Sequence, residues 1–259
     1  MTTTPRRYLL PLFVALGLVV SVSLTALPDS HPAIAAESPV GLGNAGSFAV
    51  LGATTVTNTG PTVVSGDLGV NAGSAVTGFP PGTVINGAQH ATDTLSGLAQ
   101  QDLVTAYNDA ASRTPTTSGL TALDGLTLVP GVYSGGALTL GGNLTLNGSA
   151  TGVFIFQATS TLIAGSTSHV LFSGGAGPCN VFWQVASSAT LQTNADFSGT
   201  IMAQTSVTAA TAAKITGRLL ARTGGVSMDS NVITRPTACE SSTPAPPPTP
   251  VPSRARFTG

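Results

Sequence analysis

The sequence contains few charged residues. Only 7% of its 259 residues are charged, with one lysine (Lys214) and two glutamates (Glu37 and Glu240). Helix surfaces favour Glu, Lys and Arg, so this shortage argues against a mainly helical protein. The formal net charge is −1, and Arg6 and Arg7 form the only basic pair of note. Both observations argue against nucleic acid as a partner.

Motifs for catalysis and metal binding are also missing. Without a C-x2-C spacing, a G-x-S-x-G sequence or a phosphate-binding glycine run, we assign no metal, cofactor or small-molecule substrate. Glycoside hydrolysis needs two carboxylates facing one groove. The acidic residues within the repeats described below are instead far apart in sequence: Asp67, Asp124, Asp196 and Asp229. We interpret His90 and His169 as turn or cap residues and Arg218 and Arg222 as solvated edge charges, and we predict that the protein is not an enzyme.

Threonine and glycine are abundant where charge is scarce. There are 38 Thr and 31 Gly, and 42% of the residues are hydrophobic. That much hydrophobic sequence with almost no net charge excludes disorder for most of the chain. Threonine favours strands, and a single all-β domain of this length is ordinary. The composition predicts a β-rich protein with a nearly neutral surface.

The N-terminus is typical of an export signal. Arg6 and Arg7 precede an uncharged apolar run over residues 8–27, and A-I-A at 33–35 offers a cleavage site. We therefore predict a signal peptide over 1–36 and a secreted, extracellular protein. The alternative is an uncleaved membrane anchor, because about 20 apolar residues can span a bilayer.

The C-terminus changes character after Cys239. Residues 241–259 include the proline-dense sequence TPAPPPTPVP at 243–252, which is typical of an extended tail without a core. Two interpretations stay open: a frayed end, or a spacer that associates with a cell wall or holds the domain away from it. In an exported chain, the two cysteines Cys179 and Cys239 predict one disulfide that staples the end of the domain to its middle.

The body of the chain, residues 37–240, contains internal repeats. Successive pieces each carry an apolar strand, an alternating Thr/Ser strand and a third strand ending near a glycine. They cover 153–174, 181–199, 200–217 and 218–234, with a looser copy at 137–152. Three short strands in about 20 residues are what a triangular β-solenoid needs, in which stacked coils share one core.

A single helix is expected over about 92–112. Thr92 is the expected N-cap, and apolar residues recur at helical spacing from Leu95 to Ala110. The first strand of each repeat is apolar at nearly every position, which predicts burial on both sides. We expect the helix to cover this strand row and Trp183 to lie beneath it.

The second strand of each repeat alternates, so one set of side chains points outward. The first predicted outward column is Thr139, Thr161, Thr190, Thr208 and Ser227. The second predicted column is Ala137, Thr159, Ser188, Ser206 and Gly225. Threonine ladders also occur in ordinary sheets, but this surface is nearly uncharged. Its rungs repeat at about 4.7–4.9 Å, close to the repeat distances of ice planes, and it could order water into a lattice-like layer.

Several segments in order resemble the DUF3494 ice-binding (antifreeze) proteins. They are residues 42–60, 65–79, 128–146, 153–191 and 215–233. The resemblance implies a discontinuous right-handed β-solenoid of triangular section with a long helix alongside, and binding to ice planes that inhibits growth and recrystallisation. Some family members carry a T-A/G-x-T/N pattern, which residues 208–211 match. Residues 190–193 and 55–58 match only at the outer positions, 227–230 depart from it, and Ile163 interrupts the face.

We therefore predict an exported ice-binding protein whose partners are the ice surface and ordered water. The predicted ice-binding residues are Thr55, Thr57, Thr139, Thr159, Thr161, Ser188, Thr190, Ser206, Thr208, Ala210 and Ser227. The alternative hypothesis is a non-enzymatic structural or adhesive β-solenoid module at the cell surface.

Overall fold

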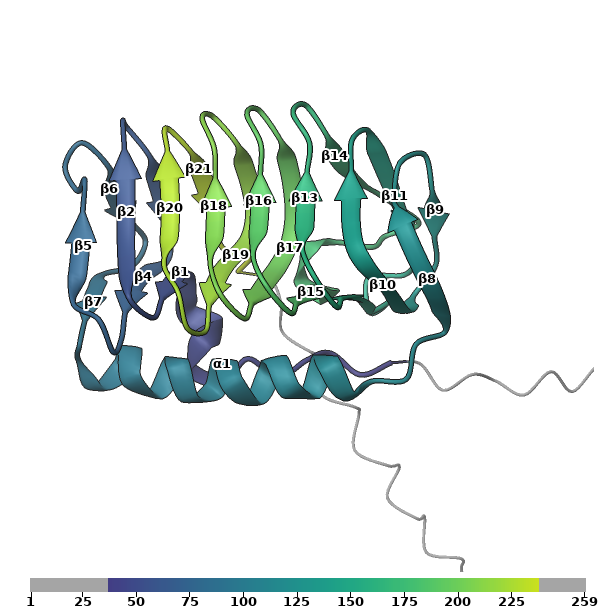
Figure 1. Cartoon of the computed structure of the whole chain (residues 1–259), viewed down its shortest axis with the longest axis horizontal. Helices are drawn as coiled ribbons and strands as arrows, with labels where there is room; N and C mark the ends of the chain where they lie inside the picture. The colour runs from purple at the N-terminus through teal and green to yellow at the C-terminus, as the bar shows by residue number, and fades with distance from the viewer. Residues whose placement is uncertain (1–36, 238–259) are drawn as a thin grey trace, which may run out of the picture. The chain divides into compact units, whose positions relative to one another are not determined.

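The computed structural model describes residues 37–237. Over this range 21 strands form one continuous sheet that winds into a β-solenoid, with a helix along one side (Figure 1). Successive coils stack in parallel, as when β12 pairs with β15 and β13 pairs with β16. The all-β solenoid with a single long helix, expected from the sequence, is confirmed.

Three faces surround the core, and each coil contributes to all of them. The helix face contains β12 (Phe154–Ala158), β15 (Val181–Val185), β1 (Phe48–Gly52), β4 (Asp67–Val70) and β7 (Gln89–Ala91). The threonine face contains, in stacking order, β8 (Thr117–Ala122), β10 (Gly131–Leu140), β13 (Leu162–Ala164), β16 (Ala189–Leu191), β18 (Val207–Ala209), β20 (Val226–Asp229), β2 (Thr55–Thr59) and β5 (Ala75–Thr77). The third face contains β9 (Thr127–Leu128), β11 (Asn143–Asn147), β14 (His169–Ser173), β17 (Asp196–Ala203), β19 (Lys214–Ala221), β21 (Val232–Thr234), β3 (Val63–Ser65) and β6 (Thr83–Ile85).

Three long strands turn a corner between faces. β17 pairs with β14 on the third face and with β15 on the helix face, and β10 and β19 likewise serve two faces. The β17 corner lies at Gly199, whose φ is +110°. A Cβ on Gly217 in the next coil would lie 1.8 Å from the Gly199 carbonyl oxygen. Stacked corners therefore need glycine for conformation and for closeness.

The order of the coils in space differs from their order in the sequence. β1, β2 and β3, from the start of the described chain, pair with β19, β20 and β21, from its end. Figure 1 shows this as the purple-blue β2 lying beside the yellow β20. We call this junction the seam. The solenoid is discontinuous because no peptide bond joins one side of the seam directly to the other.

Aromatic rings fill the middle of the solenoid, and one of them is not where the sequence predicted it. Trp183 lies inside the solenoid, where its ring stacks on Phe156 with centroids 4.0 Å apart. Its Nε1 donates to the Ser198 carbonyl oxygen at 3.0 Å. The expectation that Trp183 lies beneath the helix is wrong by one residue. Because alternate residues of a strand point to opposite sides, it is Phe182 that packs under the helix.

The helix α1 (Thr94–Ser112) lies along the helix face, as expected. Ala99, Leu103 and Ala106 pack against that face and are fully buried, so its apolar strands have cover on both sides. The predicted N-cap is corrected. Asp93, not Thr92, caps the helix, because its carboxylate accepts the Ser96 N–H at 2.8 Å.

The remaining elements are two short 3-10 helices, η1 (Gly43–Ser47) and η2 (Pro178–Asn180). Within residues 37–237, no helix is long and apolar enough to cross a membrane. The predicted signal peptide (1–36), the proline-rich tail (241–259) and Cys239 lie outside the described residues. The signal, the tail and the Cys179–Cys239 disulfide therefore stay predictions.

Candidate functional site

The threonine face carries a row of outward side chains in strict register. Each member is paired directly with the next across the parallel strands from β8 to β5. We call this the central row: Ala122, Thr139, Ile163, Thr190, Thr208, Ser227, Thr57 and Thr77. Five of the predicted binding residues lie in this row, and Thr77 is an addition. The similarity of A-V-T at 75–77 to T-V-T at 55–57 is the sequence signal that could have found Thr77.

A second row runs parallel to the central row and lies two residues earlier along the chain in each coil, in several coils just before the strand begins. This flanking row is Ala137, Thr161, Ser188, Ser206, Gly225, Thr55 and Ala75. Thr161 therefore belongs here and not in the first predicted column, where Ile163 stands. Thr159, placed in this row by the sequence, lies instead in the turn after β12, and its Oγ1 donates to the Gly135 carbonyl oxygen at 3.1 Å. The predicted alignment of this coil with the next is therefore wrong by two residues. It assumed that Leu162 pairs with Leu191, whereas the inward residue paired with Leu162 is Ala189.

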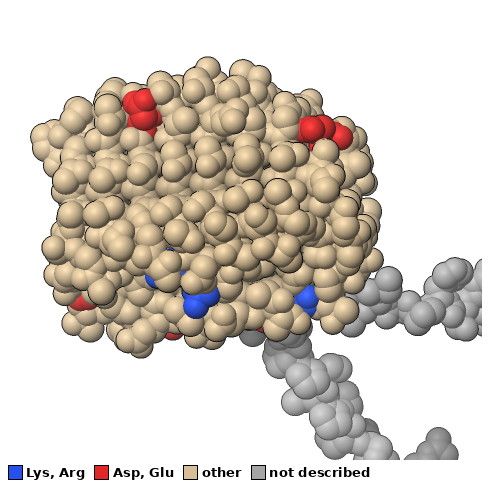
Figure 2. All heavy atoms as spheres, in the orientation of Figure 1, with Lys and Arg blue, Asp and Glu red and all other residues tan. Residues whose placement is uncertain are grey.

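A third row lies two residues after the central row and includes the acidic residues Asp229 and Asp124 among the described residues. Ala210 and Asp229 belong to it, and Asp229 pairs with Thr59 of β2. The Asp229 carboxylate accepts hydrogen bonds from the hydroxyls of Thr211 and Ser230, so the protein itself solvates the charge. Figure 2 views this face and shows acidic and basic atoms only toward its margins. The middle of the face is electrically neutral.

The outward hydroxyls are held in place from behind. The residues that alternate with them, such as Val56, Leu162 and Val207, are fully buried in the core. Thr57 Oγ1 also donates to Ser227 Oγ at 3.1 Å, which joins two members of the central row. Threonine has few rotamers because its Cβ is branched. The face is therefore a fixed grid of methyl and hydroxyl groups.

The third face offers a contrast, because it also has outward threonines. Thr216 and Thr234 are exposed and lie in register there, whereas Ser198, which pairs with Thr216, is buried. The neighbouring outward row contains Asp196 paired with Lys214, so charge alternates with the hydroxyl groups. On the threonine face, by contrast, neither the central row nor the flanking row contains a charged residue.

Acidic and histidine side chains meet at two points that the sequence did not reveal: His169 Nδ1 lies 3.8 Å from Asp196 Oδ2, and His90 lies between two carboxylates. His90 Nδ1 lies 2.6 Å from Asp93 Oδ2, and its Nε2 lies 3.7 Å from Asp67 Oδ1 of the preceding coil. The Ser96 backbone N–H and the His90 side chain lower the pKa of Asp93 to about 2. This carboxylate is an ionised helix cap. In the part of the chain that the structure describes, no group of three His, Cys, Asp or Glu side chains could hold a metal ion.

The basic side chains are less solvated than the sequence suggested. Arg218 is only 4% exposed, donates to the Gly46 carbonyl oxygen and to Thr200 Oγ1, and is no edge charge. Its burial, with Arg235 nearby, lowers its pKa to about 10. Arg222 is half-buried, with its guanidinium 4.3 Å from the centre of the Tyr107 ring. Both predictions of solvated charge are wrong because the helix and η1 cover this corner.

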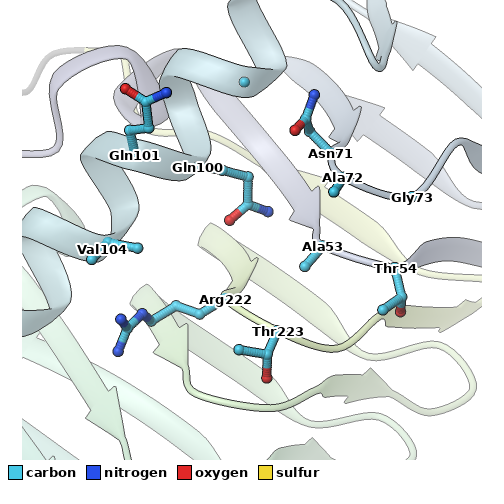
Figure 3. A pocket seen from close by; sticks show the side chains of 11 residues that line it. Ala53, Thr54, Asn71, Ala72, Gly73, Gln100, Gln101, Val104, Arg222 and Thr223 are labelled. Carbon is cyan, nitrogen blue, oxygen red and sulfur yellow. The ribbon is translucent and has the colours of Figure 1, made fainter.

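A pocket of about 650 Å³ lies where the helix crosses the seam (Figure 3). Its wall includes Ala53 and Thr54 from one side of the seam and Arg222 and Thr223 from the other. The Gln100 side chain points from the helix into the middle of this junction. Its Nε2 donates to the Gly52 carbonyl oxygen at 3.0 Å and to the Ala221 carbonyl oxygen at 3.2 Å. Gln100 therefore bridges the seam from the side opposite the threonine face.

Comparison with known proteins gives consistent matches. The profile of the Ice-binding-like family matches residues 50–234. The ice-binding protein of Nostoc sp. (strain HG1) is 46% identical over 198 residues, which cover 74% of this chain and 72% of that protein. A crystal structure of an ice-binding protein from the Antarctic ascomycete Antarctomyces psychrotrophicus has a TM-score of 0.75 and 38% identity, and covers 78% of this chain and all of that one.

A second solved structure agrees. The crystal structure of an ice binding protein from an Antarctic biological consortium has a TM-score of 0.73 and 40% identity, and it covers 77% of this chain and 92% of that chain. The sequence match extends from β1 to β21, so it includes both sides of the seam and the whole helix. The chain belongs to the Ice-binding-like family.

Proposed function

We propose that this protein binds ice through the threonine face. The observation that carries the proposal is the central row, which is uncharged and bears hydroxyl groups in register on five successive strands, from Thr190 to Thr77. The names of its relatives as ice-binding proteins support it. Neighbouring rungs lie about 4.8 Å apart and alternate residues on one strand about 6.6 Å apart, so the grid repeats in two directions.

Adsorption relies on position and not on chemical reactivity. Each threonine of the row offers a hydroxyl that hydrogen-bonds water and a methyl group that orders water around it. A single contact is weak, but the contacts add up because the grid is rigid before it meets the crystal. Preorganisation of this kind removes most of the entropy cost of ordering side chains on binding. Bound protein then blocks growth at the ice surface and slows recrystallisation.

The proposal extends to where the protein acts and what it lacks. An export signal over 1–36 supports action outside the cell, and the proline-rich tail over 241–259 is either a frayed end or a spacer that associates with a cell wall or holds the domain away from it. The structural arrangement of the acidic residues supports a protein without catalysis, because His90, Asp93 and Asp67 serve the start of the helix. The partners are the ice surface and ordered water, with no nucleic acid or small-molecule substrate.

The test is a bulky substitution in the middle of the central row. Thr208 is exposed, so Thr208→Tyr leaves the core intact but lifts the protein away from a flat crystal plane. We expect the concentration needed to inhibit ice recrystallisation to rise at least about tenfold, which corresponds to a loss of roughly 1.4 kcal/mol in adsorption. Circular dichroism confirms the fold of each variant, and a cold stage records crystal shape.

Thr216→Tyr is the matched control, because Thr216 is also an exposed threonine in a strand but lies on the third face. It should keep wild-type activity. Full activity of Thr208→Tyr would show that the threonine face is not the ice-binding surface. Folded wild-type protein that leaves ice crystals as smooth discs would favour the adhesive surface module instead.

A further inference from the structure

Hydroxyl groups do not cover the central row evenly. From β16 to β5 every member is a threonine or serine: Thr190, Thr208, Ser227, Thr57 and Thr77. Beyond β16 the row is broken by Ile163, which is 36% exposed and has no hydroxyl. Thr139 lies past that break, next to Ala122. The unbroken part spans five rungs, or roughly 19 Å at the usual strand spacing.

The seam falls inside this unbroken part. Ser227 belongs to the last coil of the domain, whereas Thr57 and Thr77 belong to its first two coils. Two of the five hydroxyl groups thus come from the opposite end of the chain. The middle rung of the five, Ser227, lies directly at the seam.

The grid is as regular across the seam as elsewhere. β20 and β2 keep register over four residue pairs, against three for β16 with β18 and for β18 with β20. Backbone hydrogen bonds close both ends of this pairing: Ala53 N–H donates to the Gly224 oxygen, and Ser230 N–H donates to the Thr59 oxygen. The hydroxyls of Thr57 and Ser227 are themselves hydrogen-bonded. An ice surface would meet one continuous plane.

We propose that the ice-contacting area is centred on the seam and is built jointly by the first and last coils of the domain. It extends from Thr190 to Thr77, so Thr57 and Thr77 are binding residues of the same weight as Thr208, and Thr139 lies outside it. This inference rests on the threonine face being the ice-binding surface.

The experiment compares tyrosine substitutions along the central row of the otherwise intact protein. Thr57→Tyr and Thr77→Tyr should each raise the inhibitory concentration at least about tenfold, as Thr208→Tyr does, whereas Thr139→Tyr should change it less than about twofold. Thr234→Tyr is the matched control, because this exposed threonine lies in the last coil beside the seam but on the third face.

The outcomes separate the two proposals. Loss of activity in Thr208→Tyr with full activity in Thr57→Tyr and Thr77→Tyr would overturn the seam-centred area and leave the ice-binding face in place. Equal loss in Thr139→Tyr would also overturn it. Full activity in all four central-row variants would overturn the face itself.

Folding is controlled separately. Hydrogen exchange at the Ala53 and Ser230 amides, which bond across the seam, reports whether the first coils stay docked. If Thr57→Tyr opens the seam, its loss of activity is not evidence about ice contact, and the result for Thr77→Tyr tests the proposal instead. Thr77 lies on the outer strand β5, which pairs only with β2 and not with a strand across the seam.

Discussion

At the residue scale, the regularity of the threonine face depends on single side chains at fixed positions. Ile163 occupies the same place in its coil as Thr190 and Thr208 do in theirs, and in each strand the residues on either side of it are buried. It keeps the methyl groups of the grid but lacks the hydroxyl. It therefore separates Thr139 from the unbroken row.

Restoring that hydroxyl should extend the binding area. Ile163→Thr would place a threonine between Thr139 and Thr190 without touching the core, because Ile163 points outward. One added hydrogen bond of about 0.5–1 kcal/mol predicts a roughly two- to fivefold lower inhibitory concentration. Ice recrystallisation assays check this, with Leu171→Thr on the third face as the control. Unchanged activity would mean that ice does not reach this rung.

Asp93 predicts a pH dependence of stability. Its pKa is lowered from 3.8 to about 2 in the folded protein, so the ionised form stabilises the fold. That stabilisation is complete above pH 3.8 and is lost as the pH falls toward 2. Asp93→Asn keeps a capping side chain but cannot titrate. The melting temperatures of the wild-type protein and of Asp93→Asn should therefore differ at neutral pH and approach each other as the pH falls toward 2. A difference in melting temperature that does not change with pH would contradict the role of the Asp93 charge.

The sequence predicted which residue types face outward but not every register. Thr190, Thr208 and Ser227 were placed correctly because their strands alternate cleanly between apolar and polar residues. Thr159 and Thr161 lie in T-S-T-L-I-A, where a bend follows Ala158 and no local signal says which threonine joins the flanking row before β13 begins at Leu162. Thr92 and Asp93 are both good caps, and only the observed bond to Ser96 distinguishes them.

At the element scale, the helix does more than cover apolar strands. Gln100 donates to one carbonyl oxygen on each side of the seam, so the helix links β1 to β19 through a side chain. Helical periodicity predicted the apolar stripe well, although Leu98, assigned to the stripe, is 43% exposed. Periodicity alone could not show what a polar residue beside the stripe would reach.

Gln100→Ala should weaken the seam. Loss of two hydrogen bonds predicts a decrease of about 1–2 kcal/mol in the free energy of unfolding, measured by urea denaturation. Amide protection at Ala53 and Thr54 should fall as well, because both bond to the Gly224 carbonyl oxygen across the seam. Gln101→Ala is the control: Gln101 is exposed on the same helix. Equal effects of the two substitutions would contradict the bridging role.

At the scale of the whole molecule, the internal repeats predicted a solenoid, and the family resemblance implied that it is discontinuous. The repeats could not predict which coils lie next to each other in space. Pairing of β2 with β20 joins residues about 170 positions apart, as the Thr57–Ser227 bond illustrates. Periodicity compares successive pieces of sequence, so it carries no information about a contact between the first and last pieces.

The predicted Cys179–Cys239 disulfide should stabilise this arrangement by tying the chain beyond β21 to the middle of the domain. Closing a loop of about 60 residues should stabilise the folded protein by at most about 4 kcal/mol. This value is the chain entropy that the disulfide removes from the unfolded state. Reducing agent should thus lower the melting temperature of the wild-type protein markedly, and the Cys239→Ser variant should melt at the reduced temperature under both conditions. A melting temperature insensitive to reduction would contradict the prediction.

The seam also sets an order for strand pairing during synthesis. The residues of β2 and β5 are synthesised long before those of β20, so one edge of β2 stays unpaired until β20 has been made. The hydroxyl row becomes whole only when the last coil arrives and closes against the first. A chain cut short before β20 therefore carries most of the threonines of this face but lacks the strand that joins β2 to β18.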